Sequence, residues 1–187
     1  MQATVGEHRA SARAQEPCAA CHMKPSTPGG RASHAFDIRG PRGLLRSSIR
    51  ASARRAGESA IVVSLSARNP GHAVPTGDLF RRLEVRASTD AGLEAKPETL
   101  ARRFVVRPVG RDGSVTRVLV GDDRLPPSGA AREVTLLLGP GAQSSAVRWE
   151  VVYRRMDPAL SLSLGVASED REIVLSRGIL PSKEARK

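Results

Sequence analysis

A regular alternation of apolar and polar residues, starting near residue 44, restricts the fold of this chain more than any other feature. In residues 60–68 the alternation places Ile61, Val63 and Leu65 on one side. A period of two is typical of a strand with one buried face, because successive side chains point to opposite faces of a sheet. The chain beyond residue 44 is therefore predicted to consist of strands.

The same period returns several times between turn-forming residues. Asp112 and Gly113 separate two of these segments, and Asp-Gly favours a tight hairpin because it tolerates positive φ angles. No long helical pattern lies between the segments, so a parallel βαβ arrangement is not expected. The fold class is predicted to be mostly β, with a short irregular N-terminal segment before an antiparallel β-sandwich of about seven or eight strands. The predicted strands are 60–68, 82–88, 104–107, 115–120, 133–138, 147–153, 160–164 and 171–175.

Residues 44–55 fit two patterns. Leu45 and Ile49 have the spacing of a helix face, but they also alternate with polar residues as in a first strand, and we favour the strand. The predicted inward-facing core residues are Ile61, Val63, Leu65, Leu83, Val85, Val134, Leu136, Trp149 and Val151.

The formal net charge of +11 favours acidic or anionic partners. Aromatic residues make up only 3% of the chain and no familiar nucleic-acid module is present, so no nucleic-acid partner is expected. No apolar run approaches the roughly 18 residues of a membrane-spanning helix, so no membrane span is expected. An acidic protein partner remains a prediction.

Both cysteines of the chain lie in one short motif, Cys-x-x-Cys-His, formed by Cys18, Cys21 and His22. This spacing is that of a c-type haem attachment site, in which the two thiols bond covalently to the haem and the histidine binds the iron. We therefore predict one covalent haem c, with His22 as the proximal ligand.

Two cysteines at this spacing could also form a redox pair, part of a zinc site or a disulfide. A thioredoxin-like redox pair is disfavoured by Pro25 and Pro28, since a helix should follow its motif. A zinc site would need two further ligands, and His34 and His72 lack the usual short spacing of a second pair. A disulfide across so short a loop would be a redox centre.

The sixth iron position has two candidate ligands, His34 and His72. His34 follows His22 by twelve residues, and a chain of that length spans up to roughly 40 Å, enough to round a haem edge. We favour His34, because a ligand on the same segment costs little loop-closure entropy, whereas His72 requires the strand-rich part to dock on the haem. His8 is expected to be exposed or to bind something beyond this chain, and Trp149 packs either on the porphyrin or in the core.

Four segments together resemble the C-terminal part of bacterial multihaem c-type cytochromes. They are the Cys-x-x-Cys-His-Met motif at 18–23, Ser-His-Ala-Phe at 33–36, Gly-His-Ala-Val-Pro-Thr-Gly at 71–77 and Asp-Asp-Arg-Leu-Pro-Pro at 122–127. The resemblance implies electron transfer outside the cytoplasm, in the periplasm or extracellular space. It also implies that His34 or His72 is a distal ligand, either to this haem or to a neighbouring one. Such proteins carry several haem motifs and an export signal, whereas this chain shows one motif and no signal, so the multihaem portion is encoded separately, lost or truncated.

The predicted organisation is a haem-attachment segment at 1–43, a β-sandwich domain at 44–180 and a basic tail at 181–187. The predicted function is one-electron transfer by a c-type cytochrome domain, with other haem-bearing redox proteins or a separate multihaem portion as partners, and without enzymatic activity. Two alternatives stay open: a haem enzyme or gas sensor with an open sixth position, and a β-sandwich interaction module without haem.

Overall fold

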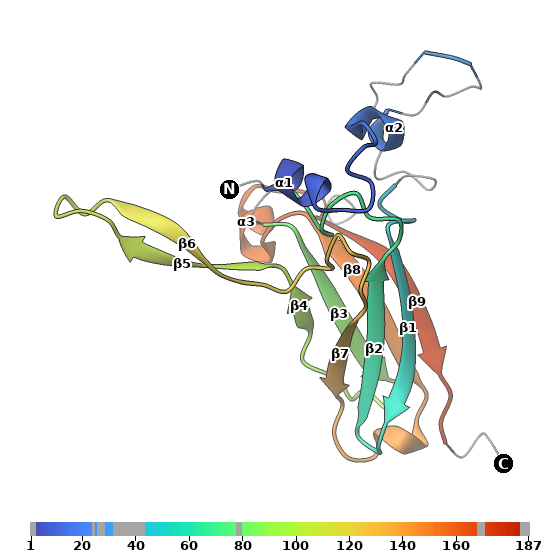
Figure 1. Ribbon diagram of the computed structural model, residues 1–187. Helices are drawn as coiled ribbons and strands as arrows, with labels where there is room; N and C mark the ends of the chain where they lie inside the picture. Colours follow the sequence, from blue (N-terminus) through green and yellow to red (C-terminus); the bar gives the residue numbers. More distant parts are fainter. Residues whose placement is uncertain are drawn as a thin grey trace.

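The structure is a computed structural model that describes residues 3–23, 25, 29–31, 44–77, 80–167 and 171–183. Figure 1 shows a body of long strands, a hairpin arm projecting from it and short helices near one end. The mostly-β prediction is confirmed. No helix among the described residues is long and apolar enough to cross a membrane.

Two antiparallel sheets form the body. In the first, β2 (Ala60–Ala67) pairs with β1 (Ile49–Ala56) on one side and with β7 (Arg132–Leu137) on the other. In the second, the strand order is β4 (Glu98–Leu100), β3 (Arg82–Thr89), β8 (Val147–Arg154) and β9 (Glu172–Leu180). We call these seven strands the two-sheet body.

Both sheets contribute side chains to one hydrophobic core. Val63 of β2 lies opposite Val134 of β7, and Val85 of β3 lies opposite Val151 of β8. The alternation seen in the sequence sets this arrangement, because the core residues of β2 and β3 occupy every second position, although Val62 and Glu84 between them are buried as well. All nine predicted core residues are at most 8% exposed, which confirms the predicted register. Trp149 belongs to this core.

The predicted hairpin forms, but it lies outside the two-sheet body. In the part of the chain that the structure describes, strands β5 (Arg102–Pro108) and β6 (Val115–Asp122) pair only with each other, and they project away from the body in Figure 1. Gly113 in the connecting turn has a φ of 79°, as the Asp-Gly signal predicts. The placement of these two strands within a sandwich was therefore wrong. We call residues 102–122 the arm.

The predicted strand at 160–164 is wrong, because this segment begins with helix α3 (Pro158–Ser163). Asp157 caps the helix by accepting a hydrogen bond from the Ala159 N–H at 2.9 Å, and the proline occupies the first turn, where it is well tolerated. Ser161 is fully buried while Leu162 is 65% exposed, the reverse of the face predicted from alternation. The cap and the proline outweighed the period-two pattern.

Three further strands differ from the sequence prediction in their bounds or were not predicted. Strand β9 runs on to Leu180, well beyond the predicted 171–175, and the short strand β4 was not predicted. The first strand is confirmed in place of a helix, and β1 begins at Ile49. Arg55 of β1 donates hydrogen bonds to the carbonyls of Pro181 and Ser145, which ties the first sheet to the end of the second.

Candidate haem site

Helix α2 (Cys18–His22) holds all three residues of the attachment motif in little more than one turn. Pro17 precedes it in an extended conformation, which favours a helix start. Cys18 is exposed and Cys21 is half-buried, and both are free thiols. The motif thus presents two accessible thiols beside one imidazole, the chemistry that covalent haem attachment requires.

A turn between β2 and β3 brings His72 to this motif. The rings of His22 and His72 have centroids 6.0 Å apart and planes inclined by 17°. A mutual pair of backbone hydrogen bonds, both 2.9 Å long, anchors the turn by joining Val74 to Leu125. The two rings are stacked, so their flat faces lie toward each other.

The surroundings of the two imidazoles differ. Nδ1 of His72 lies 3.0 Å from the carbonyl oxygen of Ala73 and donates to it when it carries the proton, which leaves Nε2 available to a metal. Burial lowers the pKa of His22, and the nearby charge of His72 lowers it further. His22 therefore favours the neutral form that binds a metal, and His72 has one ring nitrogen held by a backbone carbonyl.

A cavity of about 840 Å³ contains both histidines and both thiols. Its walls come from α1 (Thr4–Arg9), from the segment leading into α2 and from the turn that carries His72. Most of the lining is apolar, including Val5, Leu44 and Val74, as expected for a site that holds a large apolar ring system.

Helix α1 is attached to the His72 turn by a cluster of ion pairs that sequence analysis did not predict. Glu7 accepts hydrogen bonds from Arg102 and, at 2.6 Å, from Arg124, and its other oxygen accepts one from the Ala73 N–H at 3.2 Å. Arg124 also donates to the Pro75 carbonyl and pairs with Asp122. The side chains of Glu7 and Arg124 are only 12% and 5% exposed. We call these contacts the Glu7 cluster.

The Glu7 cluster explains two of the segments noted in the sequence. The Asp-Asp-Arg-Leu-Pro-Pro segment supplies Arg124, which donates to the Pro75 carbonyl, and Leu125, whose backbone pairs with that of Val74 in the turn next to His72. Its position in the sequence, far from any cysteine or histidine, gave no sign of this role. The one sign of such a role in the sequence is that this segment is among the four that resemble multihaem c-type cytochromes.

His8 is neither exposed nor available as a ligand, contrary to expectation. One ring nitrogen lies 2.8 Å from the Gly71 carbonyl and the other lies 2.9 Å from the Glu16 carbonyl. The ring therefore connects the His72 turn to the segment just before α2. Gly71 permits this close contact, because a Cβ there would lie 3.3 Å from the His8 ring.

Replacing Glu7 with Gln is expected to loosen α1 from the His72 turn. Hydrogen bonds to a charged group contribute about 1.5–3 kcal/mol, so amide exchange in residues 69–77 should accelerate roughly ten- to hundredfold at neutral pH. The matched control is Glu16→Gln, because Glu16 pairs with Arg13 at the surface and contributes little. Equal exchange rates in the two variants would show that the Glu7 cluster does not stabilise the turn.

The effect of Glu7→Gln should depend on pH. Burial raises the pKa of Glu7, but hydrogen bonds and charge from Arg124 and Arg102 outweigh it and hold the pKa below its usual value of 4.5. The stabilisation is therefore complete above that value and is lost as the pH falls through the lower pKa of the folded state. Below the lowered pKa of Glu7, the amide exchange rates of residues 69–77 in Glu7→Gln should therefore become equal to those in the unchanged protein.

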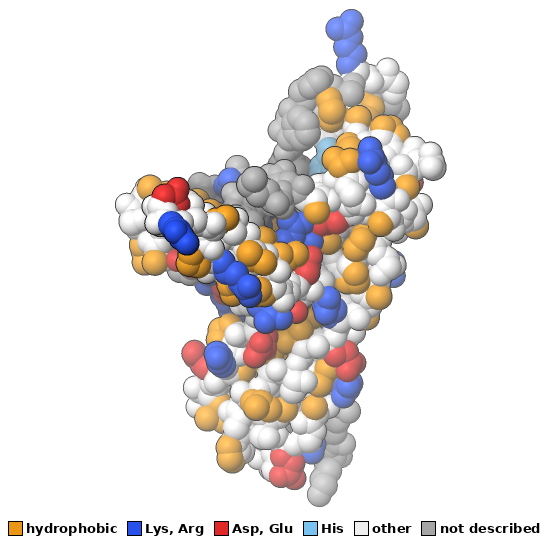
Figure 2. All heavy atoms as spheres, turned by 60° about the vertical axis from the view of Figure 1, so that its left-hand side comes forward, with side chains coloured by type: hydrophobic (Ala, Val, Ile, Leu, Met, Phe, Trp, Pro, Cys, Tyr) orange, Lys and Arg blue, Asp and Glu red, His pale blue; other side chains and the backbone are white. Residues whose placement is uncertain are grey.

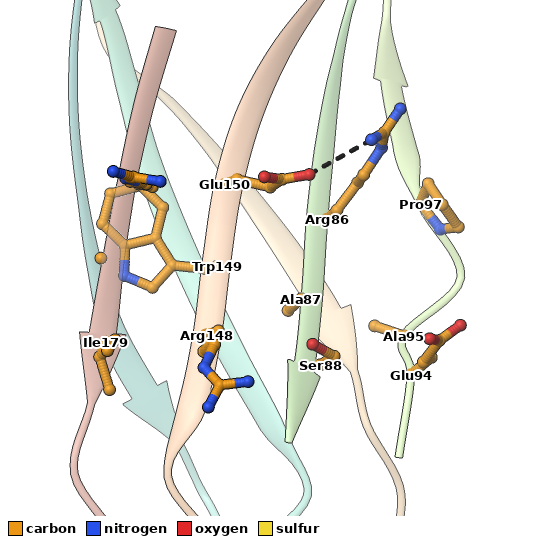
Figure 3. A pocket seen from close by; sticks show the side chains of 12 residues that line it. Arg86, Ala87, Ser88, Glu94, Ala95, Pro97, Arg148, Trp149, Glu150 and Ile179 are labelled. Carbon is orange, nitrogen blue, oxygen red and sulfur yellow. Dashed lines mark hydrogen bonds and ion pairs between the residues drawn. The ribbon is translucent and has the colours of Figure 1, made fainter. Parts of the chain in front are cut away.

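The remaining predicted positions do not enter this site. His34 lies outside the described residues, so its proposed role stays a prediction. Trp149 lies in the core, where an added Cβ at Gly178 would come within 2.7 Å of its ring. A second hollow, of about 750 Å³, lies beside it on the four-stranded sheet (Figure 3). An ion pair of 3.2 Å between Arg86 and Glu150 crosses that hollow, which contains none of the predicted ligands.

Comparisons with known proteins show that the fold of this chain is similar to one solved structure. No protein-family model matches the chain, and no curated protein matches it. Among solved structures, the penta-heme cytochrome c552 from Thermochromatium tepidum is similar, with a TM-score of 0.68 and 21% sequence identity. The match covers 94% of this chain and 49% of that one, so the chain spans about half the length of this neighbour. The chain therefore has the fold of part of a penta-heme cytochrome.

Proposed function

We propose that this chain is a c-type cytochrome domain that binds one haem covalently through Cys18 and Cys21 and carries electrons one at a time. The observation that supports this most directly is the position of His72 beside His22, in the cavity that also contains both thiols. Residues separated by fifty positions in the sequence meet there, and each is of a type that haem attachment or iron ligation requires.

We infer that two histidines bind the iron of this haem. Cys18 and Cys21 would form the thioether bonds, His22 would be the proximal ligand and His72 the distal one. When bound, the haem supplies a one-electron redox centre. The chain would contribute the apolar cavity wall and the orientation of His72 through Ala73.

The likeness to a penta-heme cytochrome supports partners that carry haem themselves. We infer that the domain exchanges electrons with other haem-bearing redox proteins or with a separate multihaem portion, in the periplasm or outside the cell. Thioether formation takes place on exported chains, so the same inference requires export.

Haem attachment is tested by producing the chain with an added signal peptide together with cytochrome c maturation proteins. A red protein whose intact mass includes one haem, with a matching pyridine haemochrome spectrum, is expected. Cys18→Ala or Cys21→Ala should strongly reduce the covalent yield, whereas Ala19→Ser, between the two thiols, should not. Colourless protein of unmodified mass would rule out the cytochrome function and favour an interaction module without haem.

A haem enzyme or gas sensor is separated from an electron carrier by the sixth position. With histidines on both sides of the iron, the reduced protein is expected to be low-spin and unreactive toward carbon monoxide. Rapid carbon monoxide binding by the unchanged protein would favour the open-site alternative.

A further inference from the structure

The arm exposes an unusual number of apolar side chains. Exposure ranges from 37% to 64% for Val105, Val106, Val109, Val115, Val118, Leu119 and Val120. Among the described residues β5 and β6 pair only with each other, so each strand also has an edge with no neighbouring strand. A two-stranded hairpin is marginally stable on its own. A soluble protein rarely exposes so many neighbouring apolar residues unless they contact something.

The base of the arm is firmly attached to the body. Arg102 at the start of β5 pairs with Glu7, and Asp122 at the end of β6 pairs with Arg124. The Asp123 N–H also donates to the Ala101 carbonyl at 3.0 Å. The arm is therefore presented at a fixed place on the body.

The charges on the projecting part of the arm are mostly positive. Arg107 pairs in register with Thr116, and Arg117 pairs with Val106, one position along each strand. Since neighbouring positions of a strand point to opposite faces, Arg107 and Arg117 lie on opposite faces of the arm, each among apolar residues. Neither they nor Arg111 at the tip forms an ion pair with an acidic side chain of the described residues. Figure 2, in which the arm points forward, shows hydrophobic and basic side chains side by side on it.

We propose that the arm is a docking surface for an acidic protein partner. Valines and leucine would supply the apolar contact, the arginines would pair with carboxylates, and the free strand edges would accept an extended segment of the partner. A second copy of this chain is a poor occupant, because it carries the same arginines and a net charge of +11. The proposal does not depend on haem binding.

The test uses the full chain and a synthetic peptide of alternating Glu and Val, as long as one arm strand. Fluorescence anisotropy should show binding that weakens as salt is added, and hydrogen exchange should show protection confined to residues 102–122. Arg117→Glu should weaken binding about tenfold or more, because one attraction becomes a repulsion. Arg50→Glu is the matched control, an exposed arginine on a body strand with the same change in charge, and it should bind almost normally.

Several results would overturn the proposal. Equal weakening by Arg117→Glu and Arg50→Glu would mean that the peptide follows the net charge rather than the arm. Protection outside residues 102–122 would place the binding elsewhere. Concentration-dependent dimers in sedimentation that disappear in a Val106→Ser, Leu119→Ser variant would assign the arm to a second copy. Arm-dependent binding to phosphatidylserine vesicles without binding to the peptide would assign it to a lipid surface.

Discussion

Leu83→Asp is expected to abolish folding of the two-sheet body. Leu83 is 0% exposed and pairs with Tyr153 of β8 and with Leu100 of β4, so it lies in the middle of the second sheet. The change forfeits about 1.5–3 kcal/mol of apolar burial, and a carboxylate buried without a partner costs several kcal/mol more. A domain of this size is stable by only about 5–15 kcal/mol, so most of its stability would be lost. Circular dichroism during urea unfolding measures the loss.

The control for this prediction is the same substitution on an exposed face. Leu137 of β7 is 71% exposed, so Leu137→Asp removes little burial and should cost no more than about 1 kcal/mol through lower strand propensity. Similar unfolding midpoints for the two variants would mean that the assignment of inner and outer faces is incorrect.

His72→Ala is expected to open the haem iron to external ligands. If His72 is the distal ligand, its removal leaves the iron with His22 alone, and the optical spectrum should change from low-spin to high-spin. Reduced protein should then bind carbon monoxide, which the unchanged protein should not. The measurement is the visible spectrum of the reduced protein before and after carbon monoxide is added.

The matched variant is His34→Ala, which replaces the ligand that loop-closure entropy favours. With His72 as ligand, His34→Ala should stay low-spin and unreactive toward carbon monoxide. An open iron in His34→Ala, with a low-spin His72→Ala variant, would restore the preference drawn from the sequence. Low-spin spectra in both variants would indicate Met156 or a ligand from a partner chain, since both ring nitrogens of His8 contact backbone carbonyls.

Much of the fold follows from local sequence pattern. The alternation around Ile61 and Leu83 identified both the strands and their buried faces, because a period of two fixes which side of a sheet each residue occupies. Where two local signals conflict, the stronger one decides the structure. At 160–164 the serine-leucine alternation suggested a strand, but the Asp157 cap and the following proline start a helix.

The arm shows a property that the alternating pattern of a strand does not predict, namely where a hairpin lies in the fold. Its residues alternate and pair as predicted, yet no sequence pattern says whether a hairpin packs on a second sheet or projects into solvent. That choice depends on which other strands are available to cover it. In this chain β3, β8 and β9 cover the first sheet and leave the arm uncovered.

The sequence by itself determined the attachment chemistry, because Cys18, Cys21 and His22 are adjacent and their spacing alone specifies the site. Only the tertiary structure decided which distant residue stands beside His22. The contacts that bring His72 there join Glu7 to Arg124 and His8 to Gly71, across more than sixty positions of sequence in each case. Loop-closure entropy favours near ligands in an isolated chain, but here folding of the two-sheet body and docking of α1 offset that cost.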